Sequence, residues 1–120
     1  MQKRILIAED EPLSRKQLAA WLEEIGYEVA VARDGAEAID LLDATEFDLV
    51  ISDIRMPRVD GFAVVSHLRS ISPTTPFIIL SAYPTEASTV SKMPRAIYMS
   101  KPVFLEELES KIRFLLQLEL

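Results

Sequence analysis

Short apolar runs separated by longer amphipathic stretches make up most of this chain. Four of the runs cover residues 4–8, 47–52, 77–80 and 96–100, and a second strand is expected at residues 28–32. Short aliphatic runs that alternate with helical stretches are typical of parallel strands buried on both faces. The pattern therefore predicts an α/β fold in which a parallel sheet is covered by helices on both sides.

The stretches between the strands repeat their apolar residues at the spacing of an α-helix. Gly26 favours the end of the first helix, whereas Asp34 and Asp60 precede glycines at the start of the second and third. The residues that carry the periodicity are Leu18, Trp21, Leu22 and Ile25, then Ala36, Ile39 and Leu42, then Phe62, Val65 and Leu68, and finally Leu105, Leu108, Ile112 and Leu115.

The candidate fourth helix, residues 84–93, differs from the others in composition. It is rich in hydroxyl-bearing and β-branched side chains, which disfavour helix through lost side-chain entropy and competing local hydrogen bonds. Pro94 restricts Met93 and prevents the helix from continuing. We therefore expect a short or irregular fourth helix of at most about two turns.

Composition narrows the function classes. The 120 residues are expected to form one domain, residues 1–120, and 49% of them are hydrophobic, which excludes disorder. The net charge of −6 and the scattered basic residues argue against nucleic-acid binding. The sequence has no cysteine and no apolar stretch of membrane-spanning length or signal-peptide pattern, so a cytoplasmic location without membrane contact is expected.

Polar residues follow four of the predicted strands at the point where each strand ends. Glu9 and Asp10 follow the first, Asp53 the third, Ser81 the fourth and Lys101 the fifth. Because ligands of parallel sheets bind beyond the carboxyl ends of the strands, these side chains are placed where a site would form.

The chemistry of these groups suggests a metal and a phosphoryl group. Three carboxylates outnumber the single ammonium, and a divalent cation would balance the excess negative charge. Oxygen ligands without His or Cys favour Mg²⁺. Asp53 is the candidate nucleophile, since a carboxylate can form an aspartyl-phosphate, and Ser81 and Lys101 could bind phosphoryl oxygens. A simpler role stays open for Glu9 and Asp10, because acidic residues after strands often cap helices.

Five segments together resemble the receiver domain of two-component response regulators. They are residues 7–11, 48–57, 60–61, 79–82 and 98–102. The similarity extends over essentially the whole chain. It implies a flavodoxin-like (βα)5 fold with strand order 2-1-3-4-5, which would place Glu9 and Asp10 beside Asp53.

The resemblance also implies roles for individual residues. Asp53 would accept the phosphoryl group, and Glu9, Asp10, Asp53 and the backbone carbonyl of Arg55 would hold Mg²⁺. Ser81 matches the switch hydroxyl, Lys101 the phosphate-pairing lysine and Tyr98 the switch aromatic. The bond between Lys101 and Pro102 is expected to be cis. Glu9 stands where the family more often has aspartate, so it could bind the metal directly or through water.

The function implied is a phosphorylation-controlled signalling switch rather than an enzyme acting on other substrates. Its partners would be a sensor histidine kinase or a histidine phosphotransfer protein, and a downstream effector domain or protein, with homodimerisation left open. Three alternatives compete with it. A receiver-like interaction module would work without phosphate, and an aspartate-nucleophile phosphatase would need a second acid where Arg55 stands. A flavodoxin-like cofactor carrier is disfavoured because the acidic loop after the first strand repels phosphate.

Overall fold

The computed structural model describes residues 2–118 and contains one five-stranded parallel sheet. The strand order is β2-β1-β3-β4-β5, as the resemblance implied. No helix among the described residues is long and apolar enough to cross a membrane. The elements follow one another as β1 (Arg4–Ala8), α1 (Pro12–Glu24), β2 (Glu28–Ala32), α2 (Gly35–Ala44), β3 (Leu49–Asp53), α3 (Gly61–Ile71), β4 (Phe77–Ser81), a 3₁₀ turn (Pro84–Glu86), α4 (Ala87–Val90), β5 (Ala96–Ser100) and α5 (Leu105–Leu118).

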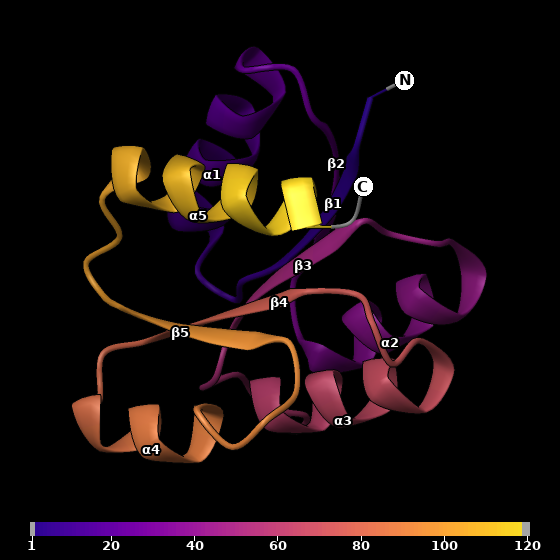
Figure 1. Ribbon diagram of the computed structural model, residues 1–120, viewed down its shortest axis with the longest axis vertical. Helices are drawn as coiled ribbons and strands as arrows, with labels where there is room; N and C mark the ends of the chain where they lie inside the picture. The colour runs from indigo at the N-terminus through magenta and orange to yellow at the C-terminus, as the bar shows by residue number, and fades with distance from the viewer. Residues whose placement is uncertain (1, 119–120) are drawn as a thin grey trace.

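The helices cover both faces of the sheet, so the molecule has three layers (Figure 1). α1 and α5 lie on one face, and α2, α3 and α4 lie on the other. Every strand pairing is parallel, and β1 lies between β2 and β3. The topological switch point therefore falls between β1 and β3, where the chain leaves the sheet in opposite directions.

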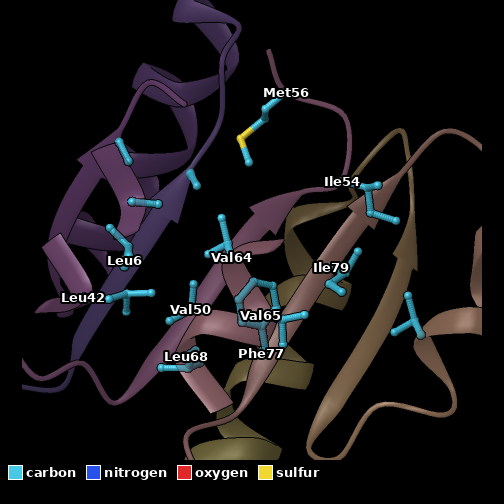
Figure 2. Close-up of a cluster of buried hydrophobic side chains, with 14 residues drawn as sticks. Leu6, Leu42, Val50, Ile54, Met56, Val64, Val65, Leu68, Phe77 and Ile79 are labelled. Atoms are coloured by element: carbon cyan, nitrogen blue, oxygen red, sulfur yellow. The ribbon is translucent and has the colours of Figure 1, made fainter. Parts of the chain in front are cut away.

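The side chains of the central strands alternate between two hydrophobic clusters. In β4, Phe77 and Ile79 point to the side of α2 and α3, whereas Ile78 and Leu80 point to the side of α1 and α5. Figure 2 shows the first cluster, in which Phe77 and Val50 of the sheet lie close to Val65 and Leu68 of α3. All five residues of β3 are buried, which explains why Leu49, Val50 and Ile51 form an uninterrupted apolar run.

The N-cap residues of α2 and α3 are those predicted from the sequence, and the N-cap of α1 is a residue that the sequence did not single out. Asp34 and Asp60 are the N-caps of α2 and α3, each accepting a backbone N–H three residues on. At α1 the cap is Glu11, whose carboxylate accepts the N–H groups of Leu13 and Ser14 at 3.2 and 2.6 Å. The capping role left open for Glu9 and Asp10 is therefore filled by their neighbour.

Gly61 fixes the approach of α3 to the end of β3. A Cβ atom at this position would lie 2.3 Å from the backbone oxygen of Asp53 and 2.8 Å from the Cα atom of Ile54. Both are backbone atoms that cannot swing aside, so only glycine fits. The backbone at Asp53 is thus held against the first turn of α3.

The predicted irregularity of the fourth helix is confirmed. α4 has only four residues, and a three-residue 3₁₀ turn precedes it. Val90 is its buried residue, and the chain reverses through Arg95, which has a positive φ of 58°. After β5, the Lys101–Pro102 bond is cis, as expected.

The start of β3 differs from the sequence pattern by two residues, because Phe47 and Asp48 precede the strand. The Asp48 carboxylate instead accepts the backbone N–H of Arg4 at 2.7 Å and so closes the opposite end of the sheet.

Candidate functional site

Residues from both sides of the switch point meet at the carboxyl edge of the sheet. Carboxylate oxygens of Glu9, Asp10 and Asp53 lie within 4.8 Å of one another. Glu9 and Asp53 are buried, with 5% and 3% of their surface exposed, whereas Asp10 is exposed. The turn after β1 supplies the first two and β3 the third, so the adjacent pairing of these strands creates the cluster.

Lys101 reaches the cluster from the end of β5. Its Nζ atom lies 2.7 Å from Oδ1 of Asp53 and 3.4 Å from Oε1 of Glu9. The turn after β1 is fixed from the other side, since the Arg15 guanidinium donates a hydrogen bond to the backbone carbonyl of Glu9 at 2.9 Å. The lysine therefore offsets part of the buried negative charge.

The two buried carboxyl groups respond differently to this environment. Burial, and next the hydrogen bond with Glu9, raise the pKa of Asp53 to about 8 against the opposing effect of Lys101. Burial alone would raise the pKa of Glu9 too, but hydrogen bonds from Asp53 and from the Glu11 N–H, together with Lys101, lower it. The interaction between the two groups therefore shifts their pKa values in opposite directions, up for Asp53 and down for Glu9.

Lys101 stays charged in this arrangement. Burial alone would lower the pKa of its ammonium group, but the hydrogen bond and charge of Asp53, and then Glu9, raise it. The positive charge is consequently available to pair with an anion that enters the site.

The donor set fits a divalent cation. One oxygen from each of the three carboxylates lies within 4.8 Å of the other two, and Asp10 is exposed to solvent, from which the ion and its waters would arrive. Such oxygen-only sets suit Mg²⁺, which uses few protein ligands and retains water. Burial, and next the hydrogen bond with Glu9, outweigh the effect of Lys101 on the pKa of Asp53, so a cation bound at the cluster would favour its carboxylate form.

Ser81 lies at the same edge, at the end of β4, and is 3% exposed. Its hydroxyl is within hydrogen-bonding distance of three groups on the following loop. The Tyr83 N–H donates to Oγ at 2.9 Å, and Oγ lies 3.3 Å from the Tyr83 carbonyl. The third group is the carboxylate of Glu86, to which Ser81 donates a hydrogen bond.

Glu86 was not identified from the sequence, where residues 84–93 stood out only for weak helix propensity. Its second carboxylate oxygen lies 3.6 Å from the Arg55 guanidinium. Arg55 in turn stacks over the Tyr83 ring at 4.0 Å from the centroid, a cation–π contact. Glu86, Arg55 and Asp10 line an open cavity of about 510 Å³ beside the carboxylates. No sequence periodicity marks such contacts, because the segment is irregular.

Tyr98 lies on β5 opposite Ile79, and its side chain reaches the end of β4. Its hydroxyl donates toward the backbone carbonyls of Ser81 and Tyr83, at 3.4 and 3.3 Å. Its ring is half-buried against the cluster that includes Val90 of α4. Tyr98 therefore touches both the loop after β4 and the packing of α4.

Comparison with known proteins agrees with this architecture. The family model described as the response regulator receiver domain matches residues 5–113. Response regulators named MprA are 37% identical in Mycolicibacterium vanbaalenii and 35% identical in Mycobacterium bovis, each over 119 residues. Those alignments cover 98% of this chain but 52% of each relative, so the chain spans about half their length.

Two solved structures illustrate the similarity in three dimensions. The receiver domain of the Francisella response regulator 1452 has a TM-score of 0.91 at 29% identity, covering 99% of this chain and 100% of that one. The response regulator TrrA of Thermotoga maritima, solved in complex with Mg²⁺-BeF, has a TM-score of 0.87 at 36% identity, covering 95% and 99%. By sequence and by fold, the chain belongs to the response regulator receiver domain family.

Proposed function

We propose that Asp53 accepts a phosphoryl group from a phosphohistidine and that this event switches the domain between two signalling states. The observation that carries the proposal is the convergence of Asp53, Glu9, Asp10 and Lys101 at one edge of the sheet. Capping does not explain this convergence, because Glu11 caps α1. The Mg²⁺-BeF complex of TrrA, a similar protein, supports the same role for this chain.

In the transfer, a carboxylate oxygen of Asp53 attacks phosphorus, and the P–N bond to the donor histidine breaks. The donor keeps the electron pair of that bond, and Asp53 becomes an acyl phosphate. The attacking form is the carboxylate, which burial and the neighbouring Glu9 oppose by raising the pKa of Asp53 and which Lys101 favours by lowering it. When bound by Glu9, Asp10, Asp53 and the Arg55 carbonyl, Mg²⁺ would supply positive charge to the carboxylates and to the transferred group.

Lys101 and Ser81 then bind the added group. The Lys101 ammonium, 2.7 Å from Asp53, can pair with one phosphoryl oxygen, and the Ser81 hydroxyl can donate to another. Tyr98 would follow Ser81, because its hydroxyl contacts the Ser81 carbonyl. Whether Glu9 binds the ion directly or through water depends on the reach of its longer side chain.

The wider setting is part of the same proposal. The donor would be a sensor histidine kinase or a histidine phosphotransfer protein, and an effector domain or protein would read the switched state in the cytoplasm. The domain would act as a switch whose only chemistry is the gain and loss of its own phosphoryl group. Residues 1–120 would belong to one receiver domain.

Intact mass spectrometry tests the proposal. Incubation with acetyl phosphate and Mg²⁺ should add one phosphoryl group to the wild type, and chelation of the metal should abolish the addition. Asp53→Asn should show no increase. Asp40→Asn, which changes an exposed aspartate on α2, should label like the wild type. Persistent labelling of the Asp53→Asn variant would exclude Asp53 as the acceptor, and a wild type that is never labelled would favour a phosphate-independent interaction module.

A further inference from the structure

We propose that Glu86 is a latch that holds the Ser81 hydroxyl away from Asp53 until a phosphoryl group arrives. The inference rests on the proposed function, since it concerns how Ser81 becomes available to that group. It starts from one bond, the hydrogen bond that Ser81 donates to the Glu86 carboxylate.

The serine hydroxyl has a single proton, and that proton is engaged by the loop. The Tyr83 N–H donates to Oγ at 2.9 Å, so one lone pair of Oγ is also occupied. The candidate acceptors within reach of Oγ are the Tyr83 carbonyl at 3.3 Å and Glu86, and a carboxylate is the stronger acceptor. To donate to a phosphoryl oxygen on Asp53, Ser81 must give up Glu86.

A second pair of contacts holds Glu86 in this position. Its other carboxylate oxygen pairs with Arg55 at 3.6 Å, and the Glu86 side chain is only 14% exposed. Arg55 is itself stacked on Tyr83 at 4.0 Å. The latch therefore joins the loop after β3 to the loop after β4, across the open side of the site.

Helix capping does not account for the position of the Glu86 side chain. Glu86 is the N-cap residue of α4, yet within the described chain its side chain makes no capping hydrogen bond to that helix. Its carboxylate is instead directed back to Ser81 and Arg55. The Glu86 side chain therefore binds the Ser81 hydroxyl and does not cap α4.

Phosphorylation would open the latch through charge. The phosphoryl group brings about two negative charges to the site, which repel Glu86 and compete for both Ser81 and Arg55. Because Glu86 ends the 3₁₀ turn and immediately precedes α4, its release would remove a restraint at the start of α4, while Val90 stays packed in the core. The latch thus links the chemistry at Asp53 to the short fourth helix.

Binding of beryllofluoride with Mg²⁺, followed by NMR, tests the latch in the intact chain. Glu86→Ala should bind beryllofluoride about 10-fold more tightly than the wild type, since one charge-assisted hydrogen bond no longer has to break. Without ligand, the Tyr83 amide resonance of this variant should already move toward its bound position. Glu86→Gln, which keeps the shape and an acceptor but not the charge, should gain about threefold.

A double-mutant cycle with Ser81→Ala separates the latch from a simple loss of negative charge. In the Ser81→Ala background, Glu86→Ala should change affinity by less than about twofold. An equal gain with and without Ser81 would overturn the latch, as would a wild-type affinity in Glu86→Ala and Glu86→Gln. Failure of the wild type to bind beryllofluoride at all would instead contradict the proposed function.

Discussion

The helices α1 and α4 both follow strands that end at the site, and they are built in opposite ways. α1 has thirteen residues, a Glu11 cap with two hydrogen bonds, and a buried Leu22 flanked by partly buried Leu18 and Trp21. α4 has four residues, no side-chain cap within the described chain, and Val90 as its buried residue. α1 is therefore fixed by its cap and by packing along one face, whereas the packing of α4 depends on Val90.

The difference separates two tasks at one edge of the sheet. The side of α1 carries Glu9 and Asp10, whose positions must not change if they are to hold a metal. The side of α4 carries the contacts of Ser81, which must change if the domain is to switch. Local stability is lowest where a protein has to move, and here that region has the weakest helix sequence.

The largest expected effect is a contrast in hydrogen exchange. Amides from Thr85 to Met93 should exchange at least about 100-fold faster than those in the centre of α1, equivalent to about 3 kcal/mol in opening free energy. Phosphorylation should alter the protection of this segment while α1 keeps its own. Equal protection in the two helices would break the comparison.

The second prediction concerns the charge of Asp53, which lies beside Glu9 and Asp10 at the end of β3. Because the pKa of Asp53 is raised to about 8, the folded state keeps a proton that the unfolded chain loses near pH 4. The stability that this proton contributes is present at low pH and is lost as pH rises through about 8. Without divalent cations, Asp53→Asn should therefore exceed the wild type in stability by a margin that grows with pH, to about 2 kcal/mol at pH 8.5.

Urea unfolding in EDTA at about pH 5.5 and pH 8.5 measures this margin. Adding Mg²⁺ should narrow it, because the cation stabilises the folded wild type. The exchange contrast between α1 and α4 should persist in the Asp53→Asn variant. A margin that is the same at both pH values would contradict the raised pKa.

A smaller effect is expected from the cap of α1. Glu11→Ala removes the acceptor of two backbone N–H groups and should lower the free energy of unfolding by about 1 kcal/mol. Glu24→Ala, at the last position of the same helix, is the matched control and should change stability by less than about 0.5 kcal/mol. Chemical denaturation of both variants distinguishes capping from a general charge effect.

The smallest effect should come from α4 itself. Ser88→Ala removes a hydroxyl that lies 3.5 Å from the Thr85 carbonyl and raises helix propensity by about 0.5 kcal/mol. Amide protection in α4 should rise about twofold, with global stability nearly unchanged. If the variant slowed exchange about 100-fold, propensity rather than missing contacts would account for the weakness of α4.

Much of the fold could be predicted because the strands are buried on both faces. The boundaries of β1, β2 and β5 match the apolar runs, and the weakness of α4 follows from its composition and from Pro94. The strand order came from the resemblance, since periodicity does not show which strands pair. The start of β3 was missed because Phe47 extends the apolar run while Asp48 is drawn to the Arg4 N–H.

The site could be predicted where it follows strand ends and not where it depends on loop geometry. Glu9, Asp53, Ser81 and Lys101 all lie at the expected edge, although their roles stay predictions. The contact between Ser81 and Glu86 spans five residues of irregular chain, so no helical or strand period connects them. Three acidic residues in a row, Glu9 to Glu11, are equally suitable caps by residue type. The backbone conformation decides that Glu11 is the cap of α1, and the sequence pattern does not show that conformation.

The complete burial of β3 has a consequence for reactivity. Asp53 ends a strand that is covered on both faces and bordered by β1 and β4, so a reagent can approach it only from the open edge of the sheet. With 3% of its surface exposed, it is shielded from bulky carboxyl-modifying reagents that would reach Asp10. If Asp53 is the phosphoryl acceptor, a small acyl phosphate can reach it through this edge, whereas a larger donor must present its phosphoryl group end-on.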